Sequence, residues 1–247
     1  MYHRSVLLWA ALFNLCMKRG EAVSLFTISD LHLSFGADKP MNIFRGWDNH
    51  TERIEANWRR LVRDEDTVIL PGDFSWSLKL ADTAPDFAFL HALPGKKLIL
   101  KGNHDLWWST SKKINDFLCE NGFDSIKTIF NNCSVAEGRA ICGTRGWFYD
   151  DSGDKKVLLR EAGRLETSLT AAKATGLPIL VFLHYPPVYG DSVCYEIFDI
   201  LKRHGVDMVY HGHIHGGGIH KSVSEFEGIR FKLVSCDCIN FTPFCIV

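Results

Sequence analysis

The stretch that decides the fold reads Leu25-Phe26-Thr27-Ile28-Ser29-Asp30-Leu31-His32, an apolar run that ends in an Asp-x-His motif. The same arrangement recurs at four further places, where a short apolar run precedes a polar cluster. Asp73 follows Val68–Leu70, Asn103 follows Lys97–Leu100, His184 follows Ile179–Leu183 and His213 follows Met208–Tyr210. Runs that are apolar on successive residues are typical of strands buried on both faces of a sheet. Open α/β sheets bind ligands beyond the carboxyl ends of their strands, so we expect the five clusters to converge.

Segments with helical periodicity alternate with these runs. The segment 52–62 places Ile54, Trp58 and Leu61 on one face, and residues 158–169 and 193–203 repeat the pattern. Strands that alternate with helices predict an α/β protein with largely parallel strands. Short strand-like segments joined by turns occupy residues 126–142 and 219–236, where we expect antiparallel additions. The sequence therefore predicts two mixed β-sheets in one domain that spans residues 23–247.

The composition is that of an ordinary globular protein without a strongly charged surface. The chain has 247 residues, 46% of them hydrophobic, and 28 basic against 29 acidic residues give a net charge of −1. This balance gives no strong nucleic-acid signal. Eight irregularly spaced cysteines do not form a small disulfide framework, which favours reduced thiols and a cytoplasmic location. A soft-metal site at Cys236, Cys238 and Cys245 is an alternative, although no partner pair has zinc-site spacing.

Residues 1–22 precede the first predicted strand and allow several interpretations. Residues 6–16 form an apolar run that is too short to span a membrane, and no small-residue cleavage site follows it. Residues 18–21 can be encoded by a purine-rich tract that resembles a ribosome-binding site, which would make Val23 a GTG start. The segment is therefore non-native, a poorly ordered extension, or a membrane anchor. The alternative that the protein is secreted depends on how this segment is interpreted. We expect no membrane association.

The clusters supply the side chains of a two-metal hydrolytic site. Their ligands are two aspartates, one asparagine and four histidines: Asp30, His32, Asp73, Asn103, His184, His213 and His215. A carboxylate can bridge two ions, and Asp73 is the isolated carboxylate suited to that position. Two divalent ions bring four positive charges and the aspartates return two negative ones, so the surplus favours a phosphate group. A water between two such ions becomes a nucleophile at neutral pH, since zinc lowers the pKa of bound water to about 7.

One His–Asp pair remains beyond the predicted ligands. His104 is free to protonate the leaving alkoxide or to steady the transferring phosphoryl group, and such help typically contributes about 10²–10⁴ in rate. Asp105 is a second candidate catalytic residue, because it could orient His104. It could equally cap the helix that follows. Ligation by nitrogen and oxygen alone fits two divalent ions of manganese, iron or zinc.

The motifs Asp-x-His, Gly-Asp, Gly-Asn-His-Asp, His and Gly-His-x-His, in that order, resemble those of the calcineurin-like metallophosphoesterases. The match covers residues 25 to 220, and Gly-Asn-His-Asp together with Gly-His-x-His is a highly specific combination. The resemblance implies two stacked mixed β-sheets flanked by helices, with His104 as the catalytic histidine. It assigns one metal to Asp30, His32, Asp73 and His215, and the other to Asp73, Asn103, His184 and His213.

Within this family the chain looks like a bacterial branch of uncharacterised predicted phosphohydrolases. Asp-Leu-His-Leu-Ser, His-Tyr-Pro-Pro and Gly-Thr-Arg-Gly-Trp recur in that branch. The sequence Phe-Ser-Trp follows Asp73, and the Val-Asp-Arg-Gly motif of Ser/Thr protein phosphatases is missing. The motif Gly102-Asn103-His104 also differs from the Gly-Asn-Arg of lipid A precursor hydrolases. Protein phosphatase and lipid A precursor hydrolase activities are therefore disfavoured.

Candidate substrate contacts are Arg145, His220 and Trp107. Arg145 could bind a phosphate or be a solvated turn residue. Five of the seven tryptophans follow motifs or strand ends, either as rim packing or as an aromatic wall for a ring of the substrate: Trp47, Trp76, Trp107, Trp108 and Trp147. We expect the substrate to be a small phosphate monoester or diester. A nuclease is one alternative, and a non-catalytic metal-binding module on the same fold is another.

Overall fold

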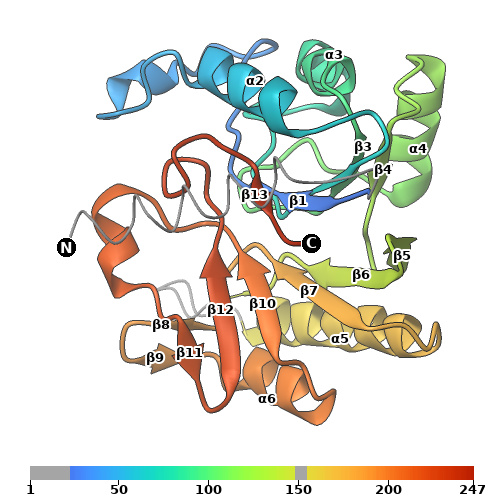
Figure 1. Ribbon diagram of the computed structural model, residues 1–247, viewed down its shortest axis with the longest axis vertical. Helices are drawn as coiled ribbons and strands as arrows, with labels where there is room; N and C mark the ends of the chain where they lie inside the picture. The colour runs from blue at the N-terminus through green and yellow to red at the C-terminus, as the bar shows by residue number, and fades with distance from the viewer. Residues whose placement is uncertain (1–22, 148–154) are drawn as a thin grey trace.

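The computed structural model describes residues 23–147 and 155–247. Interpretations of residues 1–22 therefore lie outside the described part of the chain. Two large sheets pack against each other, and helices cover their outer faces (Figure 1). This arrangement confirms the predicted fold class of two mixed sheets flanked by helices.

The first sheet combines four parallel strands with one antiparallel edge strand. Its order is β13 (Phe244–Cys245), β1 (Leu25–Thr27), β2 (Thr67–Leu70), β3 (Lys96–Ile99) and β4 (Ile126–Thr128). Neighbours from β1 to β4 are parallel, and β13 is antiparallel to β1. The prediction of an antiparallel addition beginning at Ile126 is wrong for this strand, because β4 extends the parallel order beside β3. Periodicity reports that a strand is buried but not which neighbour it pairs with.

The second sheet also has parallel strands in the centre, but it has antiparallel strands at both edges. Its order is β11 (Glu225–Phe226), β12 (Ile229–Leu233), β10 (Met208–His211), β7 (Ile179–Leu183), β6 (Arg139–Thr144) and β5 (Cys133–Ala136). Only β5 and β11 are antiparallel to their neighbours, β6 and β12. The antiparallel prediction is correct for these two edge hairpins. A separate short hairpin joins β8 (Val188–Tyr189) to β9 (Ser192–Val193).

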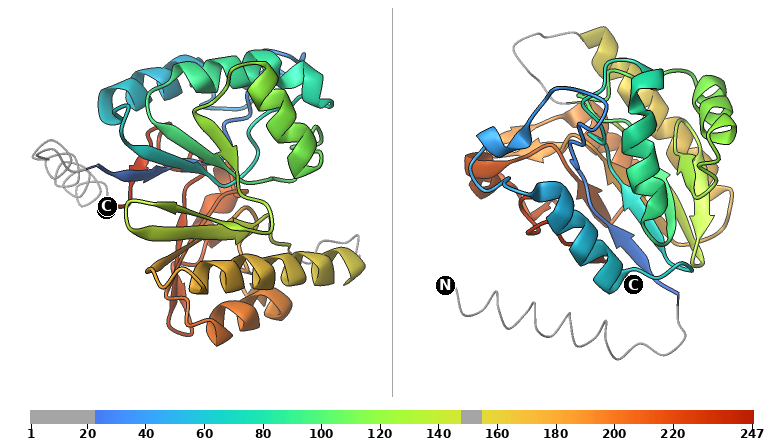
Figure 2. Two further views of the ribbon diagram at one scale, coloured as in Figure 1. Left: turned by 90° about the vertical axis from the view of Figure 1, so that its right-hand side faces the viewer. Right: turned by 90° about the horizontal axis from the view of Figure 1, so that it is seen from above.

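Helices enclose the pair of sheets from outside (Figure 2). Those over the first sheet are α2 (His50–Leu61), α3 (Ala84–Ala92) and α4 (Ser111–Glu120), and those over the second are α5 (Lys155–Lys173) and α6 (Tyr195–Arg203). Short 3₁₀ segments η1 (Met41–Ile43), η2 (Leu80–Thr83) and η3 (Gly216–Lys221) interrupt the connections. The predicted helix at 52–62 begins two residues earlier than expected.

Strand β7 shows why the buried strands are apolar on successive residues. Leu180 and Phe182 pack into the core cluster that contains the first sheet, and Phe182 stacks on Tyr210 at 5.2 Å between ring centroids. Val181 and Leu183 pack into a second cluster with α5 and α6. Both faces of the strand are buried, so no polar alternation is possible.

Two further expectations concern the described residues only. The seven cysteines among them are all free of disulfides. The two side-chain groups there that could hold a metal contain no cysteine, so the soft-metal alternative receives no support. Over the same residues, none of the helices has the length and apolar character needed to cross a membrane.

Candidate metal centre

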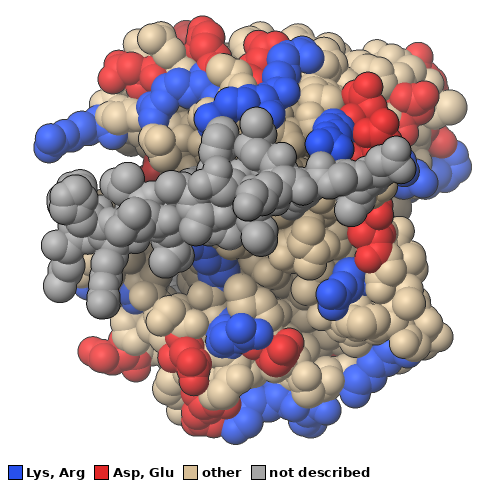
Figure 3. Space-filling model, in the orientation of Figure 1, with Lys and Arg blue, Asp and Glu red and all other residues tan. Residues whose placement is uncertain are grey.

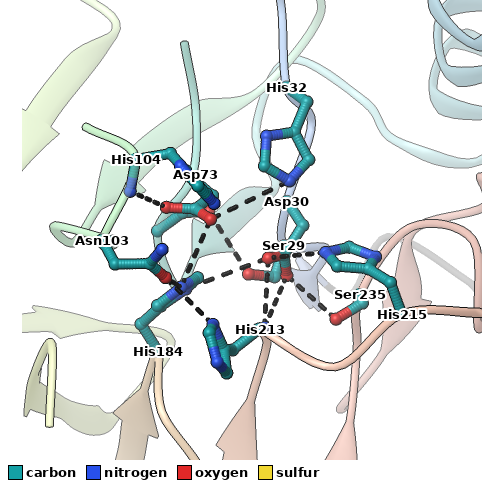
Figure 4. Close-up of polar contacts among 12 residues, drawn as sticks. Ser29, Asp30, His32, Asp73, Asn103, His104, His184, His213, His215 and Ser235 are labelled. Atoms are coloured by element: carbon teal, nitrogen blue, oxygen red, sulfur yellow. Dashed lines mark hydrogen bonds and ion pairs between the residues drawn. The ribbon is translucent and has the colours of Figure 1, made fainter. Parts of the chain in front are cut away.

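The carboxyl ends of strands from both sheets meet at one place. Within the first sheet, the Asp30 amide donates to the carbonyl of Gly72 at 3.0 Å, and the His32 amide donates to that of Asp73 at 3.0 Å. Within the second sheet, the Gly212 amide donates to the His184 carbonyl at 3.1 Å. These bonds tie each motif to the motif on the next strand. The structure therefore brings the five predicted clusters together (Figure 4).

Several of the converging residues adopt a left-handed backbone immediately after their strands. The φ angles are 61° at Asp30, 45° at His32, 51° at Asp73 and 72° at His213. This region is uncommon for residues other than glycine and costs conformational free energy. The sharp turns direct side chains from successive strand ends toward a shared centre. Left-handed residues of this kind cluster at functional sites, where the surrounding structure holds them in place.

The motif glycines are required by close backbone approach. A Cβ atom at Gly102 would lie 2.1 Å from Asp73 Oδ1, and one at Gly212 would lie 2.3 Å from Asp30 Oδ2. Any side chain at either position would displace one of the two carboxylates. These two glycines therefore permit the aspartates to lie between the sheets.

The two aspartates occupy the centre of the cluster. Asp30 belongs to both groups of residues that could hold a metal ion, one with His32 and His215 and the other with Asp73 and His184. His215 Nε2 lies 3.2 Å from Asp30 Oδ1. Asp73 Oδ2 lies 3.8 Å from His32 Nε2 and 3.4 Å from His184 Nε2, so this carboxylate also lies between the two groups. Both aspartates are at most 1% exposed.

Asn103 and His213 complete the side of the cluster that contains His184. The Asn103 side-chain oxygen lies 2.6 Å from His184 Nε2 and 2.9 Å from His213 Nδ1. The structure therefore brings together all seven predicted ligands. Their donor atoms are oxygen and imidazole nitrogen, which suit divalent ions such as manganese, iron and zinc.

The histidines around the two aspartates favour the charged form of both carboxyl groups, because they lower the pKa of each. Burial opposes ionisation of Asp30, but His215 and His184 hold its pKa well below the usual range. The pKa of Asp73 is lowered to about 2, because His184 and His32 outweigh the effect of burial. Conversely, the aspartates raise the pKa of His184 to about 9 against the effect of burial. Two buried carboxylates this close together form a site where bound cations are favoured.

Asp237 is a contact that the sequence interpretation missed. Its Oδ1 lies 2.8 Å from His215 Nδ1, and its Oδ2 accepts a hydrogen bond from the Gly216 amide at 2.9 Å. Carboxylates that bind the second nitrogen of a metal-ligating histidine fix its tautomer and ring orientation. Asp237 follows β12, so the strand-end signal that identified the other clusters could have found it. The same is true of Ser235, whose hydroxyl donates to Asp30 Oδ2 at 3.0 Å.

The prediction that Asp105 orients His104 is wrong. The buried Asp105 carboxylate accepts hydrogen bonds from five donors: the amides of Asp73, Phe74, Ser75 and Gly102 and the indole of Trp107. Burial and the charge on Asp73 raise its pKa to about 6, against the effect of these donors. Nor does Asp105 cap the next helix, because α4 is capped by Thr110, whose hydroxyl accepts from the Lys113 amide at 3.3 Å. Asp105 instead joins the loops that follow β2 and β3.

His104 stands beside the ligands and is only partly buried. Its amide donates to Asp73 Oδ1 at 2.8 Å. Its ring lies 4.4 Å from the Trp76 ring and 5.6 Å from the His32 ring, measured between centroids. The side chain is therefore next to the cluster but outside both groups of possible metal ligands.

Some of the tryptophans lie beside the cluster, and another is buried in the core. Trp76 stacks on His32 at 4.7 Å, and Trp47 lies 5.6 Å from the His215 ring, so both enclose the cluster. Trp107 is only 2% exposed, and its ring contacts Phe87 edge-on. The prediction that Trp107 contacts substrate is wrong, because its indole is buried in the core and donates to Asp105.

The other two candidate substrate contacts have different surroundings, and their roles toward a substrate stay predictions. Arg145 is not a solvated turn residue: its guanidinium pairs with the buried Glu161 at 3.2 Å and lies 4.7 Å from the Trp147 ring. His220 is exposed at the end of η3, where its ring contacts the Gly217 carbonyl. The structure does not bring His220 into the cluster.

The chain belongs to the calcineurin-like phosphoesterases, whose family model matches residues 24–217. The family and the Asp/His cluster together indicate a metal-dependent phosphoesterase. No curated protein matches the chain.

Solved structures show likeness at low sequence identity. The protein TT1561 of Thermus thermophilus is 13% identical with a TM-score of 0.57, over 91% of this chain and 98% of that one. The phosphopantetheinyl hydrolase of Mycobacterium tuberculosis is 17% identical with a TM-score of 0.49, over 88% and 90%. A protein of unknown function from Aquifex aeolicus is 19% identical with a TM-score of 0.48, over 91% and 96%. At these identities the Thermus structure supports the fold alone.

Proposed function

We propose that this protein hydrolyses small phosphate esters with a dinuclear metal centre. The observation that carries the proposal is the convergence of Asp30 and Asp73 with four histidines and Asn103 at one buried place. One ion is assigned to Asp30, His32, Asp73 and His215, and the other to Asp73, Asn103, His184 and His213. When bound, divalent ions act as Lewis acids and lower the pKa of water enough to provide a nucleophile at neutral pH.

The chain's own residues set the charge and orientation of the site. The two aspartates leave part of the charge of two divalent ions uncompensated, and this surplus attracts the phosphate group. The Asp73 carboxylate lies between both sets of ligands and is fixed by the His104 amide. Trp47 and Trp76 pack against the His32 ring and cover that side of the cluster. His104, next to the ligands but not among them, is the group that gives a proton to the leaving oxygen.

The test is a screen of aryl phosphate monoesters and diesters with the Mn²⁺-loaded protein. His104→Ala should lower kcat by about 10²–10⁴ without changing metal stoichiometry, because acid–base help of this kind has that magnitude. Asp73→Asn should lose metal as well as activity. His91→Ala is the matched control and should retain both metal and activity, because the His91 ring lies against Ser125 and Phe123. Equal inertness of the wild type and both site variants would refute the proposal.

The rival functions make different predictions in the same screen. A nuclease should cleave oligonucleotides, but basic and acidic side chains intermingle on the face shown in Figure 3. A non-catalytic module should bind metal without turning over any ester. We also propose a reducing compartment such as the cytoplasm, because the irregular spacing of the eight cysteines does not suit a disulfide framework.

A further inference from the structure

A second charged pocket lies beside the metal centre. Its wall includes Lys101 after β3, Thr144 and Arg145 at the end of β6, and Glu161 and Arg164 from α5. Asn131 and the apolar side chains of Ile129 and Phe130 close the remaining side. We call this the basic pocket, because three of its charged residues are cationic and one is anionic.

Glu161 organises the basic pocket. Its carboxylate is 1% exposed and accepts hydrogen bonds from Thr144 Oγ1 at 2.7 Å, Arg145 Nη2 at 3.2 Å and Arg164 Nη1 at 2.5 Å. The two arginines share one carboxylate, and Lys101 adds a third positive charge. The pocket therefore carries a surplus of two positive charges in a partly buried setting, where charge is screened weakly.

Two donors of the basic pocket lack acceptors. Arg145 Nε is buried and has no hydrogen-bond partner in the described chain. Within those same residues, the Lys101 ammonium group makes no hydrogen bond or ion pair. A buried N–H without an acceptor is unfavourable. A compact anion in the pocket would supply acceptors to these donors and compensate the surplus charge.

The basic pocket and the metal centre share their backbone. Lys101 is two residues before Asn103, and the Arg145 carbonyl accepts hydrogen bonds from the amides of His184 at 3.1 Å and Tyr185 at 2.9 Å. A row of rings joins the two sites: Trp147 lies 5.6 Å from Tyr185, and Tyr185 lies 4.2 Å from His213. Both sites therefore lie at the carboxyl ends of neighbouring strands.

Resting on the proposed function, we propose that the basic pocket binds a second anionic group of the substrate, a phosphate or a carboxylate. The substrate class is then a small molecule with two anionic ends, one of which is the scissile phosphate at the metal centre. The same chemistry would accept free inorganic phosphate. The experiment must therefore separate a group attached to the substrate from a free anion.

The first arm compares alkanediol bisphosphates of increasing length with the matching monophosphates, using the Mn²⁺-loaded full chain. Wild type should show a kcat/KM at least tenfold higher for a bisphosphate of suitable length. Lys101→Met and Arg164→Gln should each remove most of this preference and change kcat/KM for the monophosphates less than twofold. Arg160→Gln, an exposed arginine one turn earlier on α5, is the matched control and should behave as wild type. Circular dichroism and manganese stoichiometry check that each variant is folded and loaded.

The second arm measures binding without turnover. Calorimetric titration with inorganic phosphate should show two sites in Mn²⁺-loaded wild type and one in the Lys101→Met, Arg164→Gln double variant. One site in wild type, or two in the double variant, would overturn the pocket. Two sites without a bisphosphate preference would show that the pocket holds a free anion and would overturn its assignment to substrate. Inactivity toward every ester with two binding sites present would refute the proposed function and, with it, the assignment of the pocket to a substrate group, although the anion site itself would stand.

Discussion

Replacement of Asp105 by asparagine separates a structural role from a catalytic one. In the structure, Asp105 Oδ2 accepts from the amides of Asp73 and Gly102, and Oδ1 accepts from Phe74, Ser75 and Trp107. Asparagine has one acceptor oxygen, and its NH₂ group would face donors in either orientation. The less harmful orientation leaves two buried backbone amides without an acceptor.

The magnitude follows from those two amides. An unpaired buried donor costs about 1–3 kcal/mol, so Asp105→Asn should lower the free energy of unfolding by about 2–6 kcal/mol. In a chain of this size 1 kcal/mol corresponds to about 2–4 °C in the thermal midpoint, which makes the expected decrease at least about 4 °C. The same change loosens the turn that holds Asp73, so affinity for Mn²⁺ should also fall.

The assay combines thermal unfolding, manganese titration and kcat at saturating metal. The comparison is His104→Ala, whose ring makes no hydrogen bond in the described structure and whose loss should reduce kcat with little change in stability or metal affinity. If Asp105→Asn lost activity while its thermal midpoint and manganese affinity matched wild type, Asp105 would act on His104 after all. The five-donor interpretation would then be wrong.

Three further predictions concern the metal, its outer contacts and a buried lysine. Chelation should reversibly lower the free energy of unfolding by about 2.7 kcal/mol relative to protein with metal at 100 times its Kd, and the thermal midpoint should fall with it. It should have no effect on Asp73→Asn. Asp237→Asn should weaken manganese affinity about 10–100-fold with kcat at saturating metal nearly unchanged, because it frees the His215 ring; unchanged affinity in a titration would contradict this role. Burial lowers the pKa of Lys97 from 10.5 to about 8, so the unfolded chain binds more protons between these values and stability rises with pH there. Denaturant titrations should show wild type gaining up to about 3 kcal/mol relative to Lys97→Met from pH 8 to 10.5, and parallel curves would refute this.

The sequence predicted the fold where burial leaves a direct pattern. The continuous apolar runs predicted β1, β2, β3, β7 and β10, because both faces of each strand are covered. The edge strand β13 was not predicted, and β4 was assigned the wrong orientation. A two- or three-residue strand is defined by its neighbours in space, and its own residues carry little of that information.

The site was predictable for residues at strand ends and less so for those with buried partners. All seven predicted ligands converge, since each directly follows a strand that the sequence marks clearly. Asp105 was misassigned because its chain neighbour is His104, whereas its donors at Asp73, Phe74 and Ser75 lie about 30 residues earlier in the chain. Trp107 was misassigned because proximity to a motif does not reveal whether a ring faces solvent or core.

The carboxylates explain how the unusual backbone at these strand ends is maintained. Each of four aspartates accepts a hydrogen bond from the backbone of a motif: Asp30 from His213, Asp73 from His104, Asp105 from Gly102 and Asp237 from Gly216. These bonds offset the cost of left-handed residues and also orient the ligand side chains. Metal affinity and stability should therefore fall together when any of the four is replaced by asparagine. His104→Ala should depart from that correlation, because its side chain supports none of the turns.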